Sequence, residues 1–190
     1  MRKSQKTGLR GFCMILVRKM PKKKITKNVT KVVLFSIAFG FVEAAAVVYL
    51  REIFGLGKGY LEADRQDILL AFPGVTFLKS QAALKLLSDK TILNIEKIRE
   101  VATLLMLASL AALAGKKLKE KIAYFFLAFG IWDISYYIFL KLTIGWPKSL
   151  SDLDIFFLLP VAWAGPVFVP VVISAILVLG SFVYLKENKY

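Results

Sequence analysis

The chain has 190 residues, 57% of them hydrophobic, and a formal net charge of +14. Its mean hydropathy of +0.63 and its long apolar runs argue against a water-soluble domain and indicate a protein solvated by lipid. It has no histidine and a single cysteine, Cys13, which excludes an internal disulfide, a histidine base and the commonest ligand of zinc and haem. We therefore expect no organic cofactor, and a bound metal would be a hard cation such as Mg²⁺ held by oxygen atoms.

The positive charge is concentrated in the N-terminal region, since residues 2–31 contain many lysines and arginines and no acidic residue. Basic residues just before a hydrophobic segment follow the positive-inside rule, and anionic lipid headgroups are a sufficient partner for them. No nucleic-acid-binding motif accompanies the charge, so we do not expect binding of nucleic acid. Residues 1–30 are predicted to form a basic, disordered cytoplasmic tail, and residues 31–190 a single membrane domain.

The first predicted span covers about residues 31–54, and between Val32 and Leu50 it is apolar apart from Ser36 and Glu43. The segment 60–92 that follows is different, because charged residues and a Pro-Gly pair interrupt its apolar runs. It is too broken to cross a bilayer, and we expect a peripheral hairpin on the outer surface.

Two further spans are predicted at about residues 92–115 and 122–144, separated by a short basic loop that places their shared end in the cytoplasm. In the span 92–115 only Val101–Ala114 is cleanly apolar. The charged first third of this span must therefore lie in the outer headgroup region or inside the bundle. The span 122–144 is interrupted at mid-depth by Asp133.

The last hydrophobic stretch, residues 153–185, contains Pro160, Pro166 and Pro170. As one straight helix it would be about 50 Å long, against a hydrocarbon core of about 30 Å. It must therefore be bent or divided, and we expect an outer segment up to Ala164 followed by a full span.

These elements predict an all-α fold: a polytopic membrane helix bundle of about four transmembrane helices, the last one broken by proline, with a peripheral outer hairpin. An even number of crossings places both termini on the cytoplasmic side of the cell membrane, where the basic loop also lies.

Glu43 and Asp133 are the most informative polar residues, because each lies near the centre of an otherwise apolar span. An ionised carboxylate at that depth costs on the order of 2.5–3.5 kcal/mol even on lenient insertion scales. Both side chains should therefore face the bundle interior, where each needs a proton, a cation or a hydrogen-bond partner. We interpret them as an ion or proton site; the alternative is a structural role, with Arg99 or tyrosine hydroxyls satisfying the carboxylates.

Glu96, Arg99 and Glu100 are spaced at i, i+3 and i+4, so the three side chains lie on one face of a helix. Two carboxylates one turn apart repel each other, and the arginine between them relieves that repulsion. The spacing suits either a buried polar network or a salt-bridge cluster at the interface.

Asp133, Tyr136 and Tyr137 follow the same spacing and can place two hydroxyls beside a carboxylate, although tyrosines are also common in interfacial aromatic belts. Asp152 and Asp154 form an acidic pair expected at the outer mouth of the bundle. They either gather cations there or, more commonly for such a pair, cap the next helix.

Three regions together resemble a family of small uncharacterised prokaryotic integral membrane proteins. They are Phe41–Arg51, Arg99–Ala108 and Phe129–Tyr137, the last continuing into Gly145–Leu150 and Trp163–Val167. The resemblance covers most of the chain from about residue 32 onward, without the segment 55–90. It implies a single membrane domain and brings no activity.

The sequence predicts proton- or cation-linked transport, or ion handling, with Glu43 and Asp133 as the central site. Glu96, Arg99 and Glu100 would form its polar network, and a homo-oligomer is expected because the chain is short. The alternatives are a lipid-modifying membrane enzyme that uses carboxylates and a hard divalent cation, or an accessory subunit of a larger membrane complex.

Overall fold

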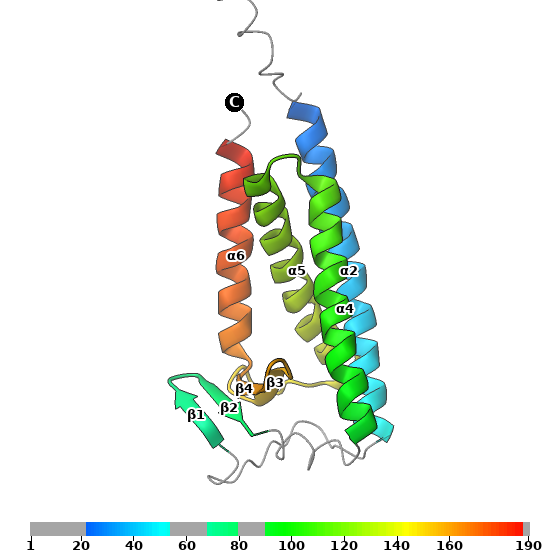
Figure 1. The fold of residues 1–190 in the computed structure, drawn as a ribbon, viewed down its shortest axis with the longest axis vertical. Helices are drawn as coiled ribbons and strands as arrows, with labels where there is room; N and C mark the ends of the chain where they lie inside the picture. Colours follow the sequence, from blue (N-terminus) through cyan, green and yellow to red (C-terminus); the bar gives the residue numbers. More distant parts are fainter. Residues whose placement is uncertain (1–21, 54–67, 80–89, 188–190) are drawn as a thin grey trace, which may run out of the picture.

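The computed structural model describes residues 22–53, 68–79 and 90–187. In chain order these residues form α2 (Lys22–Ile53), β1 (Ile68–Phe72), β2 (Val75–Leu78), α4 (Lys90–Ala114), α5 (Leu118–Ile144), β3 (Leu153–Phe157), β4 (Ala162–Pro166) and α6 (Phe168–Glu187). The four helices run side by side along the long axis of the molecule, and the strands lie together at one end (Figure 1). We call this end the sheet end. The opposite end carries the lysine-rich segment 116–121, which includes the first residues of α5, and we call it the basic end.

Three helices in the described part of the chain are long and apolar enough to cross a membrane: Lys27–Ile53 of α2, and α5 and α6 over their full length. They correspond to the first and third predicted spans and to the second half of the last one. The helix α4 lies beside them (Figure 1), but its charged first third leaves too short an apolar segment to meet the same criterion.

The helix α2 begins at Lys22, which lies within the segment predicted to be the basic tail. Residues 22–30 continue the helix of the first span instead of ending before it, so the lysines there belong to a helical turn at the basic end. Residues 1–21 of the predicted tail lie outside the described residues.

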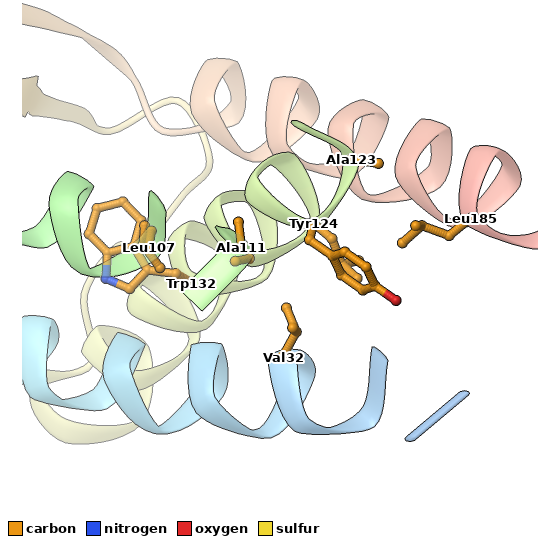
Figure 2. Packing of buried hydrophobic residues seen from close by; sticks show 9 residues of the cluster. Val32, Leu107, Ala111, Ala123, Tyr124, Trp132 and Leu185 are labelled. Carbon is orange, nitrogen blue, oxygen red and sulfur yellow. The ribbon is translucent and has the colours of Figure 1, made fainter. Parts of the chain in front are cut away.

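The helix α5 is the centre of the bundle, since it packs against α2, α4 and α6. Buried side chains from all four helices meet around it (Figure 2): Val32, Leu107, Ala111, Tyr124, Trp132 and Leu185. Leu107 of α4 is 0% exposed, whereas other large apolar side chains of the same helix, such as Leu105 and Leu113, are exposed. The other three helices therefore all bury one side against α5, and α2 and α4 also contact each other.

Two glycines allow the close approach of neighbouring helices to α5. A Cβ atom on Gly40 of α2 would lie 2.7 Å from the Cβ of Ser135 and 2.8 Å from the carbonyl oxygen of Trp132. A Cβ atom on Gly130 of α5 would lie 2.6 Å from the carbonyl oxygen of Ser174 in α6. Small residues at these crossings let the backbones pack without a driving force from water.

The all-α prediction is wrong at the sheet end, where the four strands form one antiparallel sheet in the order β1-β2-β4-β3. The expected peripheral hairpin is a β-hairpin whose turn contains Gly74 with a φ of 88°. The expected outer segment of the last hydrophobic stretch consists of β3 and the start of β4 instead of a helix. Apolar runs of this length do not by themselves distinguish a buried strand from a helix.

The prolines explain why this stretch is divided. Pro160 lies in the connection between β3 and β4, and Pro166 ends β4, so neither interrupts a helix. Pro170 lies in the first turn of α6, where a missing N–H leaves no hydrogen bond unmade. The last span is therefore not proline-broken; the prolines precede it or lie in its first turn.

The glycine contacts predict different effects on stability for two glycine-to-alanine substitutions. We expect Gly40→Ala to lower the free energy of unfolding by about 1–3 kcal/mol, because the added methyl group overpacks the crossing of α2 and α5. The matched control is Gly180→Ala in α6, where an added Cβ meets nothing within 4 Å. Thermal unfolding in detergent micelles measures both, and equal melting temperatures would contradict this account of the crossing.

Candidate functional site

A small polar cavity lies where α2, α4 and α5 meet the sheet end. Its volume is about 70 Å³, and we call it the acidic cavity. Its polar lining consists of Glu43, Arg99, Glu100, Thr103, Asp133, Tyr136 and Tyr137. The structure therefore brings together five of the six predicted core site residues; the sixth, Glu96, is bonded to Arg99.

Arg99 joins two carboxylates from different helices. Its guanidinium donates to Glu43 Oε1 across the bundle, and its Nε and Nη2 donate to Oε2 of Glu96 at 2.8 and 2.6 Å. Thr103 Oγ1 lies 3.5 Å from the other oxygen of Glu43, at the long limit of a hydrogen bond. The helical spacing of Glu96 and Arg99 thus produces a network that ties α4 to α2.

Glu100 lies outside this ion-pair network. Its two carboxylate oxygens lie 2.9 and 3.0 Å from the backbone N–H of Leu158 and both accept from it. Leu158 directly follows β3, so Glu100 attaches the sheet to α4 at the edge of the acidic cavity.

Asp133 is 9% exposed and accepts a hydrogen bond of 2.8 Å from the hydroxyl of Ser174 in α6. It lines the acidic cavity together with Glu43, although the two carboxylates have different partners. The predicted meeting of carboxylates from separate helices thus takes the form of a shared cavity.

A second group of polar residues surrounds Asp154, which is buried in β3. Arg51 Nη2 lies 3.3 Å from Asp154 Oδ1, and the hydroxyl of Tyr137 donates to Oδ2 at 3.1 Å. The guanidinium of Arg51 also lies 4.0 Å from the centre of the Trp146 ring, a cation–π arrangement. We call Arg51, Tyr137, Trp146 and Asp154 the Arg51 cluster; Tyr137 belongs both to it and to the lining of the acidic cavity.

The two aspartates predicted at the outer mouth therefore have different roles. Asp152 Oδ2 accepts from the backbone N–H of Lys148 at 2.7 Å and so closes the turn before β3, whereas Asp154 is enclosed by the Arg51 cluster. Asp152 directly precedes β3 and Asp154 lies within it, so neither caps a helix and the interpretation as a helix cap is wrong.

Burial raises the pKa of Asp154 from its ordinary 3.8 to about 6, against the opposing effects of the Arg51 guanidinium and the Tyr137 hydroxyl. The loss of hydration thus outweighs both partners.

Within the described ranges, no three acidic or cysteine side chains lie close enough together to hold a metal ion. The acidic cavity instead offers single carboxylates, each with its own hydrogen-bond partner.

No protein-family model, curated protein or solved structure matches this chain. The resemblance to small prokaryotic membrane proteins stays a prediction, and the site is interpreted from its own geometry.

Three residues that the sequence did not single out complete these sites. Ser174 is one of two serines in the otherwise apolar α6, and that is a readable signal for a polar contact inside the bundle. Arg51 and Trp146 resemble ordinary interfacial residues at the ends of spans, and their sequence context gives no sign that they lie together.

Removing the arginine of the acidic cavity tests the network directly. The side chains of Glu43 and Glu96 are 11% and 9% exposed, so Arg99→Gln leaves two largely buried carboxylates without a counter-charge. We expect a loss of about 3–5 kcal/mol in stability, measured by thermal unfolding in detergent, with Lys97→Gln of the same helix as the matched control.

The double variant Glu43→Gln/Arg99→Gln should lose less stability than the sum of the losses in the two single variants. The coupling expected for directly bonded groups is about 0.5–3 kcal/mol. Additive losses would show that the contact between α2 and α4 contributes nothing specific.

The raised pKa of Asp154 predicts how stability depends on pH. A carboxyl that binds its proton more tightly in the folded protein stabilises the fold below its unfolded pKa of about 4, and this contribution is lost as the pH rises through about 6. We therefore compare the melting temperatures of the wild type and Asp154→Asn across pH. The wild type's advantage should decrease as the pH rises from about 4 to about 6 and stay constant above that. Asp152→Asn serves as the nearby control, and a difference that rises with pH would overturn the assignment.

Proposed function

We propose that this membrane protein carries a proton or a small monovalent cation through the acidic cavity, as a proton- or cation-linked transporter. The basic end would face the cytoplasm, following the positive-inside rule, and α4 would complete a bundle of four crossings. The sheet would then cover the outer end of the cavity.

The observation that carries the proposal is the position of Asp133. Its carboxylate lines the cavity from the middle of α5, a helix apolar enough to span a membrane, and its hydrogen-bond partner in the described part of the chain is the neutral Ser174. A buried carboxylate without a positive partner is stabilised by taking up a proton or a cation. Glu43 differs, because Arg99 already neutralises it.

The charge around the cavity supports the same conclusion. Three of its lining residues are acidic, namely Glu43, Glu100 and Asp133, and among the described lining residues Arg99 alone is basic. Arg99 is already paired with Glu43 and Glu96, so its positive charge is fully used by these two carboxylates. The excess of acidic groups favours a positively charged guest.

The size of the cavity restricts what this guest can be. A water molecule needs about 10–15 Å³ of such volume, so the cavity of about 70 Å³ has room for a few waters. Sites for larger ligands occupy about 300–1,000 Å³. A proton moving through water, or a small cation with part of its hydration shell, fits the space; a metabolite does not.

A flux measurement in proteoliposomes tests the proposal. We expect the wild type to move protons, detected by an enclosed pH-sensitive dye under an imposed membrane potential, or to move Na⁺ or K⁺ when the corresponding gradient is imposed. Asp133→Asn should abolish this flux because the amide cannot take up the transported charge, and Glu43→Gln should lower it by freeing Arg99 to repel a cation.

Glu52→Gln is the matched control, since Glu52 is an exposed carboxylate of the same helix as Glu43. Its flux should equal that of the wild type at the same protein-to-lipid ratio. Flux no greater than in empty liposomes, or unchanged flux in Asp133→Asn, would reject the transport function.

A further inference from the structure

A second hollow, separate from the acidic cavity, lies between α5 and α6 near the basic end. It is an open groove of about 450 Å³, and it lies where α5 and α6 run side by side (Figure 1). Its walls include Ile122, Phe126 and Ile176, which are 45%, 39% and 63% exposed. Both α5 and α6 are apolar enough to span a membrane. In a bilayer their exposed apolar side chains would face lipid, so the groove would open to the hydrocarbon.

The groove owes its depth to a glycine of α6. Gly180 is one of the residues that line it, and a Cβ atom at this position would meet nothing within 4 Å. Gly180 therefore differs from Gly40 and Gly130, which are needed where helices touch. It leaves an apolar slot on the surface of the bundle.

The end of the groove that lies at the membrane surface is strongly basic. Lys119 lines the groove itself, and the exposed side chains of Lys116, Lys117 and Lys186 belong to the same end of the bundle. The acidic residues there are Glu187, at the end of α6, and Glu120, whose carboxylate is engaged by the backbone N–H groups of Lys116 and Lys117. The lysines outnumber these acids, so the groove combines an apolar slot with a cationic rim.

We propose that this groove is a binding site for an anionic glycerophospholipid, with an acyl chain between α5 and α6 and the phosphate beside Lys119. The occupant must be apolar along the slot and negatively charged at its end, and an anionic lipid combines both properties. A second copy of this chain fits less well, because in a parallel arrangement it would bring its own lysines to the same surface. The proposal does not depend on transport through the acidic cavity.

Lipid retention measured by native mass spectrometry tests this site. The purified protein is incorporated into nanodiscs of phosphatidylcholine and phosphatidylglycerol and then released, and the retained lipids are counted. We expect the wild type to keep phosphatidylglycerol in preference to phosphatidylcholine. Lys119→Gln should lower that preference about fivefold, the change that corresponds to about 1 kcal/mol per lysine near an anionic surface.

Two further variants separate the slot from the rim. Gly180→Phe fills the slot and should abolish retention of either lipid, and Gly180→Leu provides a milder change if the larger side chain impairs folding. Lys148→Gln, an exposed lysine at the sheet end, is the matched control and should retain lipid like the wild type. Equal retention in all variants, or retention of phosphatidylcholine at the same level, would overturn the proposal; so would a dimer that Gly180→Phe dissociates.

Discussion

A charged side chain buried among apolar helices is stable only with a partner, and in this protein the ion pair of Glu43 with Arg99 meets that requirement for two helices at once. Without Arg99, α2 would carry a carboxylate in the middle of an apolar helix. Without Glu43, the guanidinium of α4 would have only Glu96 of its own helix. The position of α4 against α2 thus depends on charge neutralisation as much as on apolar packing.

The helix α5 contributes three polar side chains to the acidic cavity. It packs against the three other helices, and Asp133, Tyr136 and Tyr137 all line the acidic cavity from it. Tyr137 also reaches Asp154, so one side chain connects the interior of the bundle with the Arg51 cluster at the sheet. The close approach at Gly40 and Gly130 holds α5 in this central position.

The sequence predicts the positions of the long helices well, and three of the four predicted spans contain helices that are apolar enough to cross a membrane. It also identifies most of the polar residues that line the acidic cavity, since a carboxylate in an apolar span stands out and the spacing of Glu96 and Arg99 fixes a common helical face. The sheet could not be predicted in the same way. Residues 153–166 are as apolar as a helix, and they are strands because β3 pairs with β4 and β4 pairs in turn with β2, a strand far away in the chain. The Arg51 cluster is hidden for a related reason, because Arg51 and Asp154 are 103 positions apart.

The ion pair between α2 and α4 has a consequence for how the protein is made. Synthesis proceeds from the N-terminus, so Glu43 is already in place in α2 when the ribosome reaches Arg99. The helix α4 does not meet the criteria of length and composition for a membrane span, and its arginine pairs with a carboxylate of a helix that precedes it in the chain. The amide of Asn28 in α2, which donates to the last carbonyl of α4 at 2.9 Å, provides a second point of attachment at the other end. The helix synthesised first thus already carries the groups that bind α4 at both of its ends.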